Sequence, residues 1–371
     1  MDRIAHRIVV LAVALLFSNA LSAQLARPSC EAVYRQALND FNAGKLDRVI
    51  AALSECADNR NNSRPLRREM LSLLATVYTY LDEDENAEQA YLNLLELDPF
   101  HLPGIDAPEL AYLSERFVTY PKFTFYVFGG PYLHTQPDVF ERYSAPEVTV
   151  GEESYRRNSS DTPGSLFGFN LALNVLHPRL DLGIGYTFST MNFRYQARLE
   201  NALRPDEVRD AAQLTFFEQH RWSHIPLYLN YRLAQPTRYN STQLIPHLYA
   251  GISIDRMHQA SARLIAPTIV FEQTEEEVSA GIVPLEDLRN SLNTSFMAGA
   301  GLKLHRRGFF FGADIQYTRM LRNLVDEKAR FSNALLVRTF NYVDSDFRID
   351  NLSVKIGVGY FFFRSKRKYA P

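Results

Sequence analysis

The sequence predicts an α+β chain of several domains, in which an N-terminal α-helical repeat domain precedes an eight-stranded antiparallel transmembrane β-barrel. Three observations support this fold class. Residues 29–117 have helical periodicity and almost no strand pattern. Residues 122–363 contain eight runs in which apolar and polar side chains alternate. The connections between these runs are short and long in strict alternation, which is typical of membrane barrels.

The first 23 residues have the three parts of a secretory signal peptide. Arg3 and Arg7 precede the apolar run 8–17, and the small-residue exit ends in Leu21-Ser22-Ala23. We therefore expect residues 1–23 to be removed after Ala23 and the mature chain to be exported. An N-terminal membrane anchor is the alternative, although the apolar run is short compared with the roughly 20 residues that a spanning helix needs.

Residues 24–117 are expected to form a helical domain in the periplasm. A first helix runs from a cap at Ser29 to Phe41, and a second contains residues 46–53. A third helix opens at Arg64-Pro65, and a fourth stops before Asp98-Pro99, because proline cannot continue a helix. The following segment, up to residue 117, would close the stack.

The third and fourth helices resemble a tetratricopeptide repeat. The resemblance rests on the spacing of Leu71, Leu74, Ala75, Tyr78, Ala87, Tyr91, Leu94 and Pro99. It implies stacked helix pairs whose concave surface binds a peptide or a helix of another protein. A generic four-helix domain is the alternative interpretation.

Two cysteines are predicted to form a disulfide. Cys30 begins the first helix and Cys56 ends the second, so an antiparallel hairpin would make them neighbours. An exported chain meets an oxidising compartment, where such a pair is normally oxidised.

The barrel is predicted over residues 122–363. Each strand places an apolar face toward lipid and a face of small or polar residues toward the lumen. The expected strands are 123–133, 167–175, 180–188, 225–233, 248–255, 296–304, 311–318 and 352–362. With flanking residues each reaches the roughly 9 to 11 residues that a tilted membrane strand requires. The lipid-facing set includes Leu171, Ile184, Leu229, Ile252, Ala300, Ile315 and Ile356.

The connections suggest which end of the barrel faces outward. Short turns are expected near 177–179, 234–242 and 306–308. Long polar loops are expected at 141–163, 196–213, 259–290 and 323–350. Short turns belong to the periplasmic side of outer-membrane barrels, and an even number of strands returns the chain to that side. A soluble β-sandwich or a lipocalin-like cup is the alternative.

The final strand ends in Phe361-Phe362-Phe363, which resembles the aromatic ending of outer-membrane barrels. The chain departs from that pattern because a basic periplasmic tail, residues 364–371, follows it. As a whole, residues 122–363 resemble the PorT-like outer-membrane β-barrel family of Bacteroidota. That resemblance implies an accessory part in a secretion or envelope-assembly complex.

Five charged residues are expected to face the lumen: Arg232, Asp255, Lys303, Asp314 and Lys355. Side chains just fill the interior of an eight-stranded barrel, and isolated buried charges are costly. We therefore expect these residues to form one structural network of ion pairs. A proton or ion path is the alternative.

No catalytic, cofactor or metal site is expected. His220 and His224 share a strand face but would lie about 13 Å apart. Ser223, His224, His258 and Asp255 could form a serine hydrolase group, which would make a lipid-modifying barrel enzyme the alternative function. The net charge of −2 gives no reason to expect a nucleic-acid partner.

The resulting hypothesis is a non-enzymatic outer-membrane barrel that anchors a periplasmic protein-binding domain. Its expected partners are outer-membrane lipid and a periplasmic protein bound through residues 30–100.

Overall fold

A computed structural model describes most of the chain. The residues outside the described part are 1–28, 105–107, 144–148, 151–155, 159–162, 176, 204–207, 235–241, 272–276, 279–281, 335–336, 338–342 and 369–371. The predicted signal peptide lies outside the described residues, and so does the turn expected at 234–242 for most of its length. None of the described helices combines the length and the apolar composition needed to cross a membrane.

The chain forms two compact units. One consists of the residues up to Val118 together with those from Ser365 onward, and the other is Thr119–Arg364. The chain therefore passes between the units twice.

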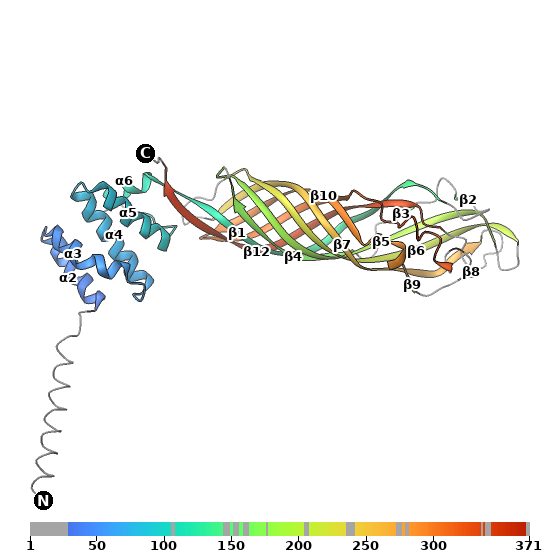
Figure 1. The fold of residues 1–371 in the computed structure, drawn as a ribbon, viewed down its shortest axis with the longest axis horizontal. Coiled ribbons are helices and arrows are strands. Elements are labelled where there is room, and N and C mark those ends of the chain that lie inside the picture. The colour runs from blue at the N-terminus through green and yellow to red at the C-terminus, as the bar shows by residue number, and fades with distance from the viewer. Residues whose placement is uncertain are drawn as a thin grey trace, which may run out of the picture. The chain divides into compact units, whose positions relative to one another are not determined.

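The first unit contains the predicted helices (Figure 1). They are α2 (Cys30–Asn42), α3 (Leu46–Asp58), α4 (Arg64–Tyr80), α5 (Asp84–Leu97) and α6 (Pro108–Glu115). Ser29 caps α2 by accepting a hydrogen bond from the Ala32 amide at 3.3 Å, and Ser63 caps α4 in the same way. The order and starting points of the helices agree with the sequence pattern. Their identity as tetratricopeptide repeats stays a prediction.

The helices pack through the apolar stripes that their periodicity predicts. Val49, Leu53, Met70, Tyr91 and Leu94 are fully buried in one cluster. A disulfide joins Cys30 at the start of α2 to Cys56 near the end of α3. The predicted pairing of the two cysteines is confirmed.

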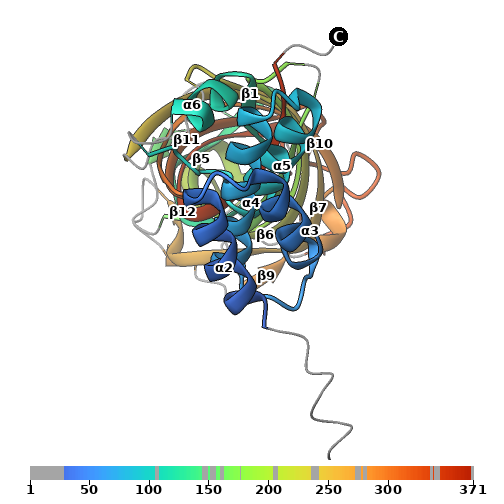
Figure 2. The same cartoon turned by 90° about the vertical axis from the view of Figure 1, so that its left-hand side faces the viewer.

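The second unit contains eight long strands that close into a ring (Figure 2). They are β1 (Phe117–Glu141), β4 (Ser165–Asn174), β5 (Leu180–Leu203), β6 (Arg209–Arg232), β7 (Gln243–Phe271), β10 (Leu292–Arg306), β11 (Phe309–Met320) and β12 (Asp346–Arg367). Neighbours in the chain pair with each other, β12 pairs with β1, and β7 pairs with β10. Each predicted strand corresponds to one of these eight, and two of the predictions, 167–175 and 225–233, run one residue past the observed strand ends at Asn174 and Arg232.

The register gives the barrel two distinct ends. At the turn end, β4 meets β5 around residues 177–179, and β10 meets β11 at Arg307-Gly308. Arg307 and Gly308 both have positive φ, as a tight two-residue hairpin requires. The barrel also begins and ends at the turn end, while the longer connections lie at the opposite, loop end.

Three strands continue well past the ring at the loop end (Figure 1). β5, β6 and β7 contain 24, 24 and 29 residues, against the roughly 9 to 11 that span a membrane. The short strands β2 (Thr149–Val150) and β3 (Arg156–Asn158) pair with β5, and β8 (Glu277–Val278) and β9 (Ile282–Pro284) pair with β7. Much of the segments expected as loops at 196–213 and 259–290 is therefore paired strand, which satisfies backbone groups that an open loop would leave to water.

The basic tail was expected to be a separate segment from residue 364 onward, but its first residues continue the last strand. β12 continues to Arg367, and the Lys368 amide donates to the Arg116 carbonyl at 2.8 Å. Arg367 Nε lies 2.7 Å from a carboxylate oxygen of Glu88, a largely buried residue of α5 that also pairs with Arg116 at 2.8 Å. Residues 365–368 of the tail thus belong to the helical unit.

Candidate functional site

The outer surface of the barrel is apolar on all eight strands. Each strand exposes at least one large apolar side chain, for example Val127, Phe169, Ile184, Leu229, Ile252, Leu302, Ile315 and Ile356. Leu229 is 52% exposed and Ile315 is 55% exposed. Of the predicted lipid-facing set, only Leu171 is half-buried; the others are exposed. A continuous apolar belt of this kind exceeds by far the patches that soluble monomers tolerate.

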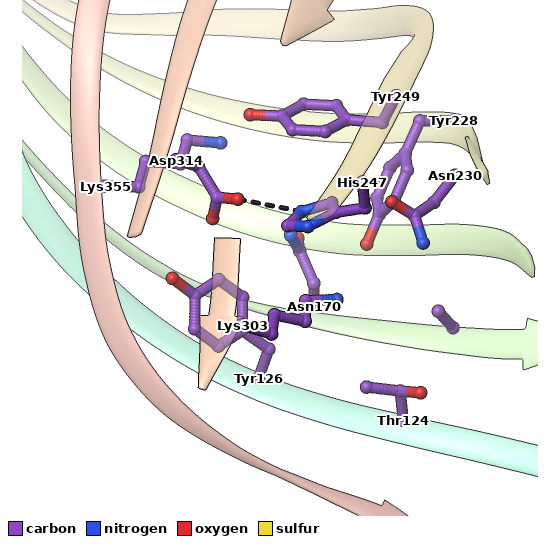
Figure 3. Close-up of a pocket in the computed structure, with 11 residues that line it drawn as sticks. Thr124, Tyr126, Asn170, Tyr228, Asn230, His247, Tyr249, Lys303, Asp314 and Lys355 are labelled. Carbon is purple, nitrogen blue, oxygen red and sulfur yellow. Dashed lines mark ion pairs between the residues drawn. The ribbon is translucent and has the colours of Figure 1, made fainter. Parts of the chain in front are cut away.

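The lumen is polar and contains an ionic cluster centred on Asp314 of β11. His247 of β7 points toward it, with Nε2 2.8 Å from Asp314 Oδ1 (Figure 3). Gly301 on β10 leaves the space that this carboxylate occupies, because a Cβ there would come within 1.9 Å of Asp314 Oδ1.

Two buried lysines lie in the same part of the lumen and rest on aromatic rings. Lys355 Nζ donates to the Gln316 side chain at 2.6 Å and lies 4.5 Å from the centre of the Phe128 ring. Lys303 Nζ lies 5.1 Å from the Phe310 ring centre. The aromatic ring faces and the negative charge of Asp314 offset part of the free-energy cost of removing both ammonium groups from water.

Side chains fill this region almost completely. The cavity beside Asp314 and the next one toward the loop end have a volume of about 30 Å³ each, enough for a water molecule or two. Tyr228 fills the space opposite Gly183, where a Cβ would lie 2.2 Å from its ring. In the described part of the chain the lumen is therefore a packed core, as expected for eight strands.

A second ionic cluster lies nearer the turn end. Arg232, which is fully buried, donates to Asp181 at 2.8 Å and to the Pro178 carbonyl at 2.9 Å. Asn230 donates to the other oxygen of Asp181 at 3.0 Å. This cluster fixes the β4–β5 turn onto the neighbouring strand β6.

A third cluster, nearer the loop end, has the connectivity of a Ser-His-Asp triad. Asp255 Oδ1 lies 2.7 Å from His224 Nδ1, and His224 Nε2 lies 2.8 Å from Ser189 Oγ. Ser253 and Ser295 also donate to Asp255. Ser189 is only 1% exposed, and the cavity beside His224 holds only water-sized volume. An acyl substrate has no room to reach the hydroxyl, although the hydrogen-bond geometry alone suits nucleophilic catalysis.

The serine that the sequence singled out lies elsewhere. Ser223 faces the outside of the barrel, where its hydroxyl is 2.6 Å from His258 Nε2 and 2.6 Å from the Tyr186 hydroxyl. His258 stacks on Phe188. The predicted group of Ser223, His224, His258 and Asp255 is thus divided between the two faces of the wall, because consecutive strand residues point in opposite directions.

A salt-bridged plug closes the loop end beyond the apolar belt. Arg289 pairs with Glu218 at 2.8 Å and with Asp344 at 2.7 Å, and its guanidinium lies over the Phe347 ring. Burial raises the pKa of Glu218, but Arg289 and His220 lower it more, so the net pKa is below its usual value. Buried apolar residues surround these charges, among them Trp222, Phe193, Leu285, Leu288 and Leu324.

All five predicted lumen charges are buried and face inward, but they do not form one network. Asp314, Lys303 and Lys355 share one cluster, whereas Arg232 pairs with Asp181 and Asp255 binds His224. The sequence reasoning missed Asp181 and His247 as partners, whereas it named His224 beside Asp255 in the alternative hydrolase group. Asp181 lies on the inward face of a predicted strand, which was the available signal, and His247 directly precedes the predicted strand 248–255. Among the described residues, no group of three or more His, Cys, Asp or Glu could hold a metal ion.

The helical unit, in contrast, carries an open groove of about 560 Å³. α2, α4 and α6 provide most of its lining, which includes Tyr34, Phe41, Glu69, Tyr80 and Glu109, and His101 between α5 and α6 completes it. A hydrogen bond to Glu109 raises the pKa of Tyr80, and burial followed by the charge of Glu69 raises the pKa of Tyr34. Its volume far exceeds that of the two water-sized cavities in the lumen.

No protein-family model matches the chain, and no curated protein matches it. Three solved barrels are similar at 11% identity. The N-terminal β-barrel domain of Pseudomonas aeruginosa OprF covers 66% of this chain and 100% of its own, with a TM-score of 0.28. The outer membrane protein OprG of the same organism covers 66% and 97%, with a TM-score of 0.33. The translocator domain of autotransporter NalP from Neisseria meningitidis covers 77% and 98%, with a TM-score of 0.22.

Proposed function

We propose that this chain is a non-enzymatic outer-membrane protein whose β-barrel anchors a periplasmic helical domain that binds another protein. The observation that carries the proposal is the combination of an apolar outer belt on all eight strands with a lumen packed shut by side chains. The belt supports insertion into lipid, and the packed lumen supports anchoring over conduction.

The direction of the chain supports a periplasmic position for the helical unit. Both chain connections to the helical unit leave from the turn end of the barrel. Outer-membrane barrels keep their short turns on the periplasmic side. The open groove on α2, α4 and α6 supports a binding role for this unit, as an accessory part of a secretion or envelope-assembly complex.

Protease treatment of intact cells tests this arrangement. In intact cells we expect the protease to cut within residues 259–290 and not within residues 24–120. In lysed cells it should cut both segments. Cleavage of the helical unit in intact cells would contradict the proposed orientation. Recovery of the wild-type protein in the soluble fraction without detergent would contradict membrane insertion.

A deletion tests the docking role. Cells that express the chain without residues 30–100 should still show a heat-modifiable barrel in the outer membrane. Cross-linking in these cells should lose the periplasmic partners that the full chain captures. If every partner survives the deletion, the helical unit is not the docking surface.

A lipid-modifying enzyme is the second candidate function, and the Ser189–His224–Asp255 geometry is the observation that favours it. We place it second because the hydroxyl of Ser189 is buried against a cavity of about 30 Å³.

A further inference from the structure

The groove of the helical unit has an aromatic wall. Phe41 of α2 and Tyr80 of α4 lie with their ring centres 6.2 Å apart. Tyr34 and Leu38 extend this wall along α2, and Leu110 lies on α6. Tyr80 is 53% exposed, so its ring is available to a ligand.

Two carboxylates accompany the rings. Glu109 of α6 accepts a hydrogen bond from the Tyr80 hydroxyl, and Glu69 of α4 lies close enough to Tyr34 to act on its titration. Arg68 is the one arginine or lysine that lines the groove within the described residues, and it already pairs with Asp98 at 3.4 Å. None of the described arginines or lysines forms an ion pair with Glu69 or Glu109. Among the described residues, Glu69 and Glu109 therefore place two carboxylates beside the aromatic faces without an arginine or lysine partner, and His101 is the other basic side chain that lines the groove with Arg68.

We infer that the groove binds a segment of the partner protein in which a lysine or arginine is flanked by apolar side chains. The cation would lie on the Phe41–Tyr80 wall with Glu69 or Glu109 as counter-ion, and the apolar neighbours would cover Leu38 and Leu110. A cation gains from aromatic faces and from a carboxylate at the same time. The inference rests on the proposed docking function and specifies the chemistry of the partner.

Peptide binding to the full-length protein in lipid nanodiscs tests the inference. The probes are three fluorescent 12-residue peptides of equal length that combine leucine with lysine, with glutamate or with glutamine. We expect the lysine peptide to bind at least about tenfold more tightly than the glutamate peptide, with an affinity that falls as salt rises. Equal binding of all three peptides, or preference for the glutamate peptide, would overturn the cationic chemistry.

A matched pair of charge reversals locates the site. Glu69→Lys should weaken the lysine peptide about tenfold or more and should reduce the salt dependence. Glu85→Lys makes the same change of charge at an exposed position of α5 outside the groove, and it should have little effect. Equal losses in both variants would mean that the peptide responds to net charge, which would overturn the groove as the site.

Tyr80→Ala separates the aromatic contribution from the charge. It should weaken binding of the lysine peptide about fivefold, which corresponds to the free energy of an exposed cation–π contact. The circular dichroism spectrum of the variant should stay unchanged.

The deletion of residues 30–100 keeps this inference distinct from the docking proposal. If partners are lost on deletion but persist in Glu69→Lys and Tyr80→Ala cells, docking stands and the cationic groove is wrong.

Discussion

The barrel lumen and the helical groove are lined by the same kinds of side chain, but only one of them has space. The lumen combines tyrosines, acids and bases around cavities of about 30 Å³. The groove combines tyrosines, the acids Glu69 and Glu109, and the bases Arg68 and His101 around about 560 Å³. In the lumen Asp181, Asp255 and Asp314 each have a basic partner within 2.8 Å. The available volume, more than the residue types, therefore separates the packed lumen from the open groove.

The largest expected effect comes from breaking a buried lumen pair. Arg232→Met leaves Asp181 charged in a packed lumen, which should cost about 3 to 5 kcal/mol of barrel stability. Urea titration followed by heat-modified gel mobility measures the loss. The double variant Arg232→Met/Asp181→Asn should recover part of it, because it removes the unpaired charge. If the two variants are equally unstable, Arg232 contributes through packing and the lumen is less charge-dependent than we describe.

The outer surface provides the contrast to the lumen. Ile356→Arg should cost about 2 to 4 kcal/mol if this residue lies near the bilayer midplane. Its neighbour Gly357 should reject arginine for a steric reason, since even a Cβ would lie 2.0 Å from the Val127 carbonyl oxygen. The folding yields of the two arginine variants in bilayers of different thickness distinguish the two causes. Only the yield of the Ile356 variant should change with bilayer thickness. Tolerance of Ile356→Arg without loss would argue against the lipid belt.

The helical unit depends on a covalent link that the barrel does not share. Cys56→Ser removes the disulfide to Cys30 and should lower the stability of this unit by about 3 kcal/mol. Limited proteolysis should then cut residues 30–100 faster, while the gel mobility of the folded barrel is unchanged. A parallel loss of barrel stability would show that the two units unfold together.

The smallest expected effect concerns the buried triad. Ser189→Ala removes one hydrogen bond to His224 and should change stability by about 1 kcal/mol. We expect the wild-type protein not to react with a fluorophosphonate probe, because the hydroxyl is buried. Labelling that disappears in Ser189→Ala would support the lipid-modifying candidate and would make this part of the lumen a site.

The sequence by itself determined the elements and their faces. Alternation identified all eight strands and placed Ile184, Leu229 and Ile315 outside and Asp314 inside, because a strand turns each successive side chain to the opposite face. Helical periodicity, the cap at Ser29 and the start at Arg64-Pro65 located α2 to α5. The position of Cys30 and Cys56 at neighbouring helix ends was enough to predict their bond.

Only the tertiary structure decided which of these residues meet. Asp314 contacts His247 across β10, and Arg232 meets Asp181 instead of the other predicted charges, because strand register and barrel stagger set the partners. The long extensions of β5, β6 and β7 also depend on pairing with each other. The groove is formed by side chains from three helices separated in the chain, α2, α4 and α6. A one-dimensional pattern fixes the direction in which a side chain points, but its neighbour and the space between them arise only when distant segments pack.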